Sequence, residues 1–282
     1  MKTISSHRLR SGLVGVLVLT VLILGMTPSR AALLLLEDFD GIAAGPLGNV
    51  SGWTTVDLTR TYSIVTTPPG SASDHLLEST NTEAYSYKAT PEAIAESGNT
   101  VGTLYFQVYT TGASTGLSIG LTQEGGSNFT DYRAQMAFNN GVSVISGSAG
   151  TAHAIDNISF ESDTWYHLWM VVDNATNTWS AYLLGGDITE VTQLSYGTNS
   201  TFDFRATAAA PIESLFIARG TGGGANRGYI NNLYFGLGDL HGELPPSAIP
   251  EPSTVMLLGA GLLLGAIRRA RSMRRRLPSE RD

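Results

Sequence analysis

Residues 165–184 read WYHLWMVVDNATNTWSAYLL, two runs rich in aromatic and β-branched residues joined by the short connection Asn174–Asn177. Asparagine tolerates the left-handed backbone conformation that tight loops require, and a short Asn/Thr-rich connection between two such runs is typical of a β-hairpin. The sequence therefore predicts two long antiparallel strands, Trp165–Asp173 and Thr178–Leu184.

The alternation of inward and outward residues with a period of two recurs along the chain, as in Val101–Thr110, where Leu104, Phe106 and Val108 share one face. Further strands are predicted at Tyr62–Thr66, Leu117–Leu121, Tyr132–Phe138, Val142–Ser146, Ile155–Phe160, Ile212–Ala218 and Gly228–Phe235. One short helix is expected at Pro91–Ser97. Many antiparallel strands without intervening helices predict an all-β sandwich or barrel, because each apolar strand face needs an opposing sheet.

The first 31 residues have the three parts of a secretory signal peptide, expected as an N-terminal signal helix. Three basic residues precede the apolar run Leu13–Met26, and a short polar stretch follows it. Ser29 and Ala31 are the small residues three and one positions before a cleavage site, so we predict cleavage after Ala31 by signal peptidase after Sec-type export. An uncleaved signal anchor is the alternative.

A second apolar run, Val255–Ile267, stands near the C-terminus and predicts a single helix over 253–267. A helix of this length spans about 20 Å, against about 30 Å for the hydrocarbon core of a membrane. The run is followed by Arg268, Arg269, Arg271, Arg274, Arg275 and Arg276. Positive charge beside an apolar segment stays cytoplasmic, so both ends of the chain place residues 32–250 outside the cytoplasm.

Pro250, Glu251 and Pro252 stand directly before this helix, at the end of a Pro/Gly-rich linker, 236–249. This order of Pro-Glu-Pro, apolar helix and arginine cluster resembles the PEP-CTERM sorting signal of Gram-negative, exopolysaccharide-making bacteria. The resemblance implies recognition by a membrane-embedded exosortase, cleavage near the Pro-Glu-Pro, and transfer of the body from the membrane to the cell surface or matrix. A plain tail anchor is the alternative.

The expected organisation is a signal peptide at 1–31, a β-sandwich domain at 32–235, a linker at 236–249, a sorting signal at 250–276 with its arginine cluster at 268–276, and a tail at 277–282. Residues 1–31 and 251–282 each carry a charge of +4, which leaves −15 on the body out of a total of −7. An acidic body argues against a nucleic-acid partner, which needs cations to displace phosphate counterions. The absence of Cys excludes disulfides and a Cys nucleophile.

The central hairpin, the closing run Gly228–Phe235 and the opening run Leu36–Gly41 together resemble laminin-G-like, concanavalin-type jelly rolls. The resemblance spans most of the body. It implies an antiparallel two-sheet β-sandwich whose last strand closes against its first.

Some jelly rolls of this class are glycanases whose Glu-x-Asp-x-x-Glu motif places two carboxylates about 5 Å apart. Glu161 and Asp163 have the first spacing of that motif, but Tyr166 occupies the position of the second Glu. Since the retaining mechanism then lacks its proton donor, we expect no enzyme. A glycan hydrolase or lyase whose site the sequence hides is the alternative.

Two kinds of binding site are candidates by residue type. Asp38 and Asp40, on one face of a predicted strand, could hold a structural Ca²⁺ with Asn231 or Asn232 of the closing strand, although a solvated acidic strand end is equally consistent. Trp53, Trp179, Tyr182 and Tyr109 are candidates for stacking on a sugar, with packing inside the sheets as the alternative.

The predicted function is that of a non-catalytic surface or matrix protein, sorted by exosortase, whose jelly roll binds glycan or packs within extracellular polysaccharide. A purely structural module is the third hypothesis beside this one and the hidden enzyme.

Overall fold

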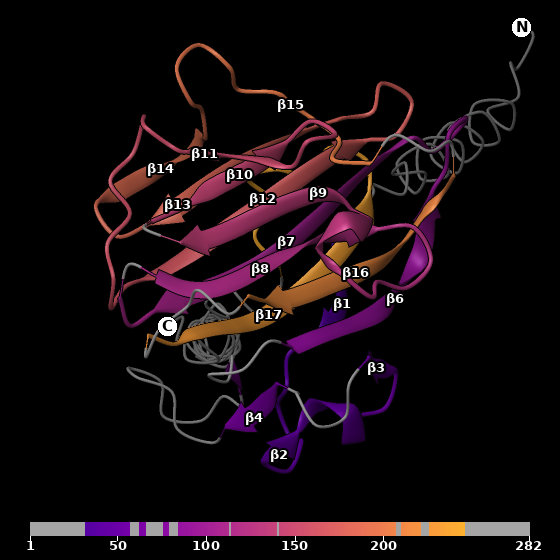
Figure 1. The fold of residues 1–282 in the computed structure, drawn as a ribbon, viewed down its shortest axis with the longest axis vertical. Coiled ribbons are helices and arrows are strands. Elements are labelled where there is room, and N and C mark those ends of the chain that lie inside the picture. The colour runs from indigo at the N-terminus through magenta and orange to yellow at the C-terminus, as the bar shows by residue number, and fades with distance from the viewer. Residues whose placement is uncertain are drawn as a thin grey trace, which may run out of the picture. The chain divides into compact units, whose positions relative to one another are not determined.

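The computed structural model describes residues 32–56, 62–65, 76–78, 84–112, 114–139, 141–206, 210–220 and 226–245. The chain divides into two compact units, Met1–His241 and Gly242–Asp282, and the described residues belong almost wholly to the first (Figure 1). The predicted signal peptide, apolar helix, Pro-Glu-Pro and arginine cluster lie outside the described residues. Among the residues that the structure describes, no helix is long and apolar enough to cross a membrane.

The first unit is built from β-strands joined by turns and loops. The strands are β1 (Leu34–Glu37), β2 (Gly45–Pro46), β3 (Trp53–Thr55), β4 (Ser63–Val65), β5 (Leu76–Glu78), β6 (Ala84–Ile94), β7 (Val101–Thr110), β8 (Ser114–Thr122), β9 (Tyr132–Asn139), β10 (Ser143–Ser146), β11 (Thr151–Ala154), β12 (Trp165–Asp173), β13 (Thr178–Gly185), β14 (Ile188–Gln193), β15 (Phe202–Asp203), β16 (Ile212–Arg219) and β17 (Gly228–Leu237). Two short 3₁₀ turns, η1 (Leu47–Asn49) and η2 (Phe129–Asp131), interrupt them.

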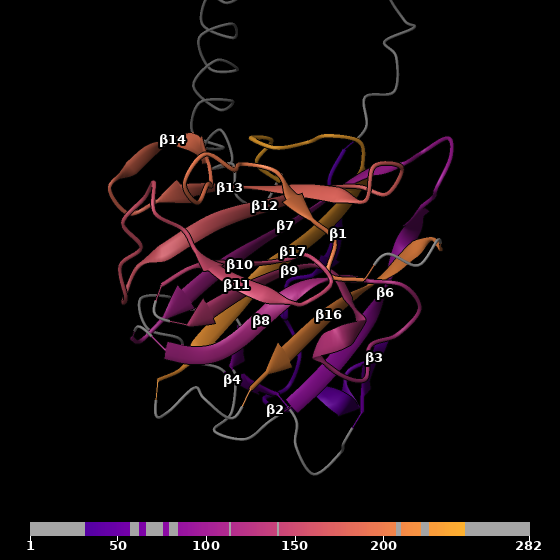
Figure 2. The same ribbon diagram turned by 45° about the horizontal axis from the view of Figure 1, so that its top comes forward.

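The strands form two antiparallel sheets that pack face to face. Sheet A has ten strands in the order β14-β13-β12-β7-β17-β5-β4-β2, with β1 also paired to β17 and β15 to β13. Sheet B has seven strands in the order β11-β10-β9-β8-β16-β6-β3. Figures 1 and 2 show β8, β9 and β16 in one layer and β7, β12 and β17 in the other. The prediction of an all-β, antiparallel two-sheet sandwich is confirmed.

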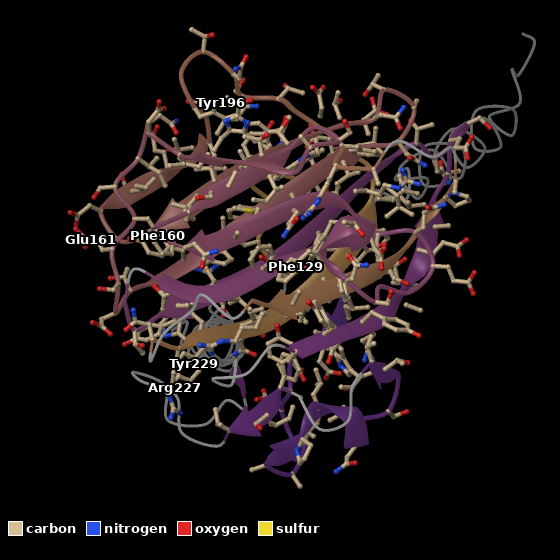
Figure 3. All side chains as sticks on the ribbon, viewed as in Figure 1. Phe129, Phe160, Glu161, Tyr196, Arg227 and Tyr229 are labelled. Carbon is tan, nitrogen blue, oxygen red and sulfur yellow. The ribbon has the colours of Figure 1, made fainter. Side chains whose placement is uncertain are left out.

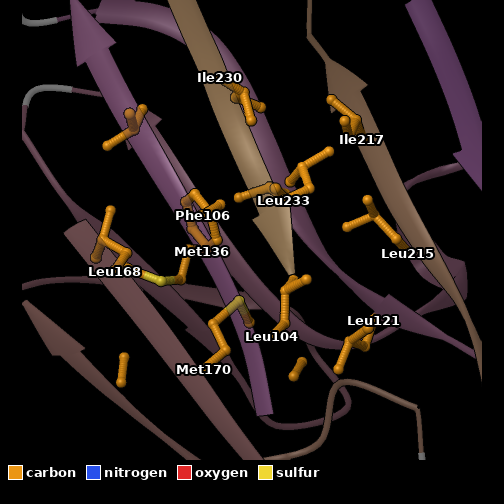
Figure 4. Packing of buried hydrophobic residues seen from close by; sticks show 14 of the residues in the cluster. Leu104, Phe106, Leu121, Met136, Leu168, Met170, Leu215, Ile217, Ile230 and Leu233 are labelled. Carbon is orange, nitrogen blue, oxygen red and sulfur yellow. The ribbon is translucent and has the colours of Figure 1, made fainter. Parts of the chain in front are cut away.

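The core lies between the sheets and is made by the residues that the period of two assigned to one face. Leu104 and Phe106 of β7 and Leu168 of β12 meet Met136 of β9 and Ile217 of β16, all with 0% exposure (Figure 4). Burying each such side chain contributes about 1.5–3 kcal/mol to stability. Apolar packing therefore fixes which face of each sheet points outward.

The predicted hairpin is confirmed as β12 and β13, with Trp169 opposite Tyr182 in the register. Asn177 in its connection has a φ of 55°, the left-handed conformation expected of an Asn there. The buried Asn174 amide donates to the carbonyls of Ile94 and Ala210, at 3.1 Å each. The connection thus also ties the hairpin to the ends of two strands of sheet B.

The last strand lies beside the first, as the jelly-roll resemblance implies, with Leu35 of β1 opposite Tyr234 of β17. The packed structure continues beyond Phe235, the predicted end of the domain. The Thr103 hydroxyl donates to the Gly238 carbonyl (2.7 Å) and accepts from the Leu240 amide (3.0 Å), and Leu240 is buried. The first residues of the predicted linker are therefore part of the sandwich.

Two local predictions are wrong. Ile155–Phe160 is a loop rather than a strand: its apolar side chains cover the edge of the core, and Phe160 stacks on Tyr166 at 4.4 Å. Pro91–Ser97 is not helical, because β6 runs through Pro91 to Ile94. Ile94 is fully buried and pairs with Ile212 beside a bulge, so packing in the sheet overrides the helical propensity of the segment.

Candidate functional site

A cavity of about 680 Å³ opens on the outer face of sheet B. Its walls come from β3, from the middle of β6, from the end of β8 and from the loop 123–131 that follows β8. Most of its lining side chains carry hydroxyl, amide or carboxylate groups. The lining residues are Thr54, Thr55, Val56, Tyr87, Thr122, Gln123, Glu124, Gly125, Gly126, Ser127, Thr130, Asp131 and Ala206.

The loop 123–131 folds back over sheet B because two glycines let it approach. Gly125 has a φ of 60°, and a Cβ there would lie 3.2 Å from the Tyr87 ring. A Cβ on Gly126 would lie 2.6 Å from the Phe216 ring, closer than real contacts allow. The loop therefore rests directly on aromatic rings of the outer face and closes one side of the cavity.

The same loop is stiffened by its own hydrogen bonds. Asn128 caps η2, and its side chain accepts from the Thr130 amide at 2.7 Å. The Asp131 carboxylate accepts from the Ser127 amide (2.7 Å), the Ser127 hydroxyl (3.1 Å) and the Asn128 amide (3.0 Å). This capping box holds the cavity wall in one conformation.

An aromatic cluster adjoins the cavity on the outer face of sheet B. Tyr132 packs on Phe216 with ring centroids 4.7 Å apart, and Tyr85 packs on both Phe216 and Phe129 (6.1 and 5.5 Å), with Phe129 lying over the middle of the sheet in Figure 3. The Tyr132 hydroxyl donates to the carbonyls of Ser118 and Phe216, and burial raises its pKa well above the usual value. The cluster adjoins the cavity through the half-buried Tyr87, which packs against it and lines the opening, and through Gly126, which lies on the Phe216 ring.

Two arginines lie beside the cavity. Arg133 on β9 is 1% exposed, and its guanidinium donates to the carbonyl of Ala206, a lining residue. Arg205 donates to the Gln135 side chain at 2.7 Å. Burial lowers the pKa of both guanidinium groups. The site therefore combines hydroxyls, carboxylates and one half-buried tyrosine ring, with two arginines nearby.

The structure buries two of the aromatic residues proposed from the sequence. Trp53 is 6% exposed and packs on Phe39 inside the sandwich, and its indole N–H donates to Glu37. Trp179 is 1% exposed and packs on Phe202 with centroids 4.9 Å apart. Neither ring presents a face to solvent on which a sugar could stack.

The other two aromatic candidates lie on the outer face of sheet A, opposite to the cavity. Tyr182 stacks on His241 with centroids 4.0 Å apart, and Tyr109 donates its hydroxyl to Asp163 at 3.0 Å. Tyr87, which does line the cavity, was not among the candidates. Its residue type alone carried no signal that distinguished it from the other tyrosines.

The proposed calcium ligands lie where the chain turns. β1 ends at Glu37, and Phe39 is buried with a φ of 61°, so Asp38 and Asp40 are not on one strand face. The Asp38 carboxylate accepts from the Asp40 amide at 3.0 Å. The Asn232 amide donates to Gln107. Within the described ranges, no three His, Asp or Glu side chains converge as metal ligands, and a Ca²⁺ site stays a prediction.

The incomplete glycanase motif is divided between a loop and the core. Glu161 and Asp163 lie in the loop before β12, and the Glu161 amide donates to the buried Tyr166 hydroxyl at 3.0 Å. In Figure 3 Glu161 is at the edge of the sandwich, far from Phe129 and the cavity loop. The motif and the cavity are therefore separate features of the molecule.

Comparison with known proteins bears on the two parts of the chain differently. Several solved structures are similar to this chain. A seed lectin from Lotus tetragonolobus is 9% identical with a TM-score of 0.46, and the match covers 72% of this chain and 97% of that one. Lectin II from Ulex europaeus is 10% identical with a TM-score of 0.48 (74% and 98% covered), and the catalytic domain of a glycoside hydrolase family 131 protein from Coprinopsis cinerea is 11% identical with a TM-score of 0.47 (77% and 99% covered). All three TM-scores are below 0.5, and no activity follows from these likenesses.

No curated protein matches the chain by sequence. Residues 248–275 match the family described as the PEP-CTERM protein-sorting motif, which confirms the resemblance drawn from Pro250, Glu251, Pro252 and the residues after them. The chain thus combines an antiparallel two-sheet β-sandwich with a C-terminal PEP-CTERM sorting motif.

Proposed function

We propose that this chain is an exported surface or matrix protein whose sandwich binds glycan, without catalysis, in the cavity on sheet B. The sorting motif supports the delivery half of the proposal: Sec-type export, cleavage of the signal peptide, passage through the membrane and processing by an exosortase. The acidic body fits a destination outside the cell, among hydrated polysaccharides.

The proposal that the sandwich binds glycan rests on the chemistry of the cavity. Its volume of about 680 Å³ is within the range of about 300–1,000 Å³ typical of ligand sites. A sugar ring has hydroxyls around its edge and apolar C–H faces. The Tyr87 ring can stack on such a face, while Thr54, Thr122 and Gln123 supply hydrogen-bond donors and acceptors.

The carboxylates of the cavity support binding rather than hydrolysis. A glycosidase needs two carboxyl groups that flank the scissile bond, one of them free to donate a proton. Asp131 already accepts three hydrogen bonds from its own loop. Among the described lining residues, Glu124 is thus the one carboxylate outside the capping box, and it suits recognition of sugar hydroxyls.

The test is a glycan array followed by calorimetry on the full-length protein, with Tyr87→Ala as the variant. Loss of the stacking ring should weaken binding by about tenfold. Tyr182→Ala is the matched control, because it removes the same kind of ring from sheet A, and it should leave affinity unchanged.

Two results would contradict the proposal. If Tyr182→Ala weakened binding and Tyr87→Ala did not, the site would be on sheet A. Release of reducing sugar from a bound polysaccharide would show catalysis and replace a binding module with an enzyme.

A further inference from the structure

Two of the few cations of the body are neighbours through a backbone hydrogen bond, and neither forms a direct ion pair with a described residue. Residues 32–250 contain six Lys and Arg, and two of these, Arg133 and Arg205, are neighbours, since the Arg205 amide donates to the Arg133 carbonyl at 2.9 Å. Within the described ranges, neither guanidinium forms an ion pair. Arg133 is buried and Arg205 is half-buried, and Glu96 and Asp131 attract them only from beyond ion-pair distance. The buried Arg133 guanidinium therefore has no anion bonded to it among the described residues.

Arg133 has one edge of its guanidinium occupied and the other unused. Its Nη1 donates to the Ala206 carbonyl, whereas Nε and Nη2 are buried without any hydrogen-bond partner. Nε and Nη2 form the side edge of the group, where two N–H bonds point in parallel. This edge has the spacing of the two oxygens of a carboxylate and binds them in a bidentate manner.

The unused edge is costly for the folded protein. A charged donor that loses water without gaining a partner destabilises the fold, and burial accordingly lowers the pKa of Arg133. Two other cations of sheet B have partners of their own: the partly buried Lys88 pairs with Glu37 at 2.9 Å, and the buried Arg219 donates to the Asn226 carbonyl at 3.4 Å. The fold therefore supplies a carboxylate to Lys88 and leaves the Arg133 edge for a group from outside.

We infer that the glycan bound in the cavity carries carboxylates, as a polymer of uronic acid does, and that Arg133 binds one of them through Nε and Nη2. The inference rests on the proposed function. Ala206 both lines the cavity and accepts the bond from Nη1, so the guanidinium lies next to the cavity wall. Because Nε and Nη2 are themselves buried, the proposed contact requires the carboxylate to displace Ala206.

The decisive ligands are a galacturonic acid hexamer and its fully methyl-esterified form, which keeps the rings and hydroxyls but removes the charge. In calorimetry with the full-length protein, the acid should bind about tenfold or more tightly than the ester, because a bidentate bond between charged groups is lost with the ester. Arg133→Lys keeps the positive charge but removes the two-point edge, and should abolish this preference. Arg227→Lys, the same substitution directly before β17, is the control and should retain it.

The outcomes separate this inference from the proposed function. Equal binding of acid and ester by the wild-type protein overturns the uronic-acid inference and leaves glycan binding intact. Retention of the preference in Arg133→Lys overturns the role of Arg133. If Arg133→Lys does not fold, the comparison of acid and ester on the wild-type protein still decides the ligand class. Binding of neither hexamer overturns the inference, while the glycan array decides the proposed function independently.

Discussion

Glu37 joins the first strand of the sandwich to sheet B through two donors. Its carboxylate accepts from the Lys88 ammonium at 2.9 Å and from the Trp53 indole at 3.1 Å, and the Lys88 and Glu37 side chains are 16% and 12% exposed. The ammonium also lies 5.6 Å from the centroid of the Trp53 ring. One residue thus connects three segments that are distant in sequence.

Lys88→Met should leave the Glu37 carboxylate buried without a cation and lower the free energy of unfolding by about 3 kcal/mol. Denaturant unfolding followed by tryptophan fluorescence measures this loss. The double variant Lys88→Met with Glu37→Gln also removes the unpaired carboxylate charge and should recover much of the lost free energy of unfolding. A single variant as stable as the wild-type protein would show that the pair is effectively solvated.

The sequence alone could not assign roles to individual aromatic residues. Trp53 and Trp179 were proposed for sugar stacking because tryptophan suits that task, yet both rings fill the interior of the sandwich. The side of the sheet that a ring faces depends on register and bulges. At the start of β9 a shift in pairing places Tyr132 opposite Thr122 and Ala134 opposite Leu121, which no local pattern indicates.

At the scale of elements, β8 and β9 approach closely where β8 carries a glycine. A Cβ on Gly120 would lie 1.9 Å from the carbonyl oxygen of Ala134 and 3.0 Å from the Tyr132 ring. Because the nearest atom belongs to the backbone, a rotamer change cannot relieve the clash. The glycine therefore leaves room for Tyr132 to lie against β8 and pack on Phe216.

Gly120→Ala should force β8 and β9 apart and destabilise the protein by about 1–3 kcal/mol or more. Thermal unfolding monitored by circular dichroism would register this as a lower midpoint. Gly220→Ala is a suitable control, since the nearest atom to its Cβ is 3.5 Å away in the Phe129 side chain. An unchanged midpoint for Gly120→Ala would mean that the two strands separate at little cost.

Element prediction succeeded where apolar residues alternate over long segments and failed where they serve another purpose. The hairpin β12–β13 and the strands β7, β9, β16 and β17 follow directly from alternation. The loop at 155–160 is apolar because it covers a core edge, and its Asn157 side chain bonds to the Gln193 carbonyl and the Ser195 amide instead of a neighbouring strand. Such contacts are set by tertiary structure.

At the scale of the whole molecule, the sorting motif that directs the protein to the surface could be predicted from the sequence, whereas the cavity could not. A sorting signal is a contiguous stretch of sequence, so it can be recognised from the sequence alone. The cavity draws on residues from Thr54 to Ala206, and its chemistry exists only after β3, β6 and the loop 123–131 come together. Arg133 shows its unpaired edge only once the fold has removed it from water.

The two processing events proposed for the chain can be read from a single mass. In a host that has an exosortase, the protein recovered from outside the cell should lack residues 1–31 and the residues after about Pro252. Because the apolar segment and its arginines are then gone, the product should leave the membrane without detergent. Replacing Pro250, Glu251 and Pro252 by Ala should keep the tail and hold the protein in the membrane fraction. A wild-type protein recovered with its tail intact would instead establish a plain anchor, and the sandwich would then meet its glycan at the membrane surface.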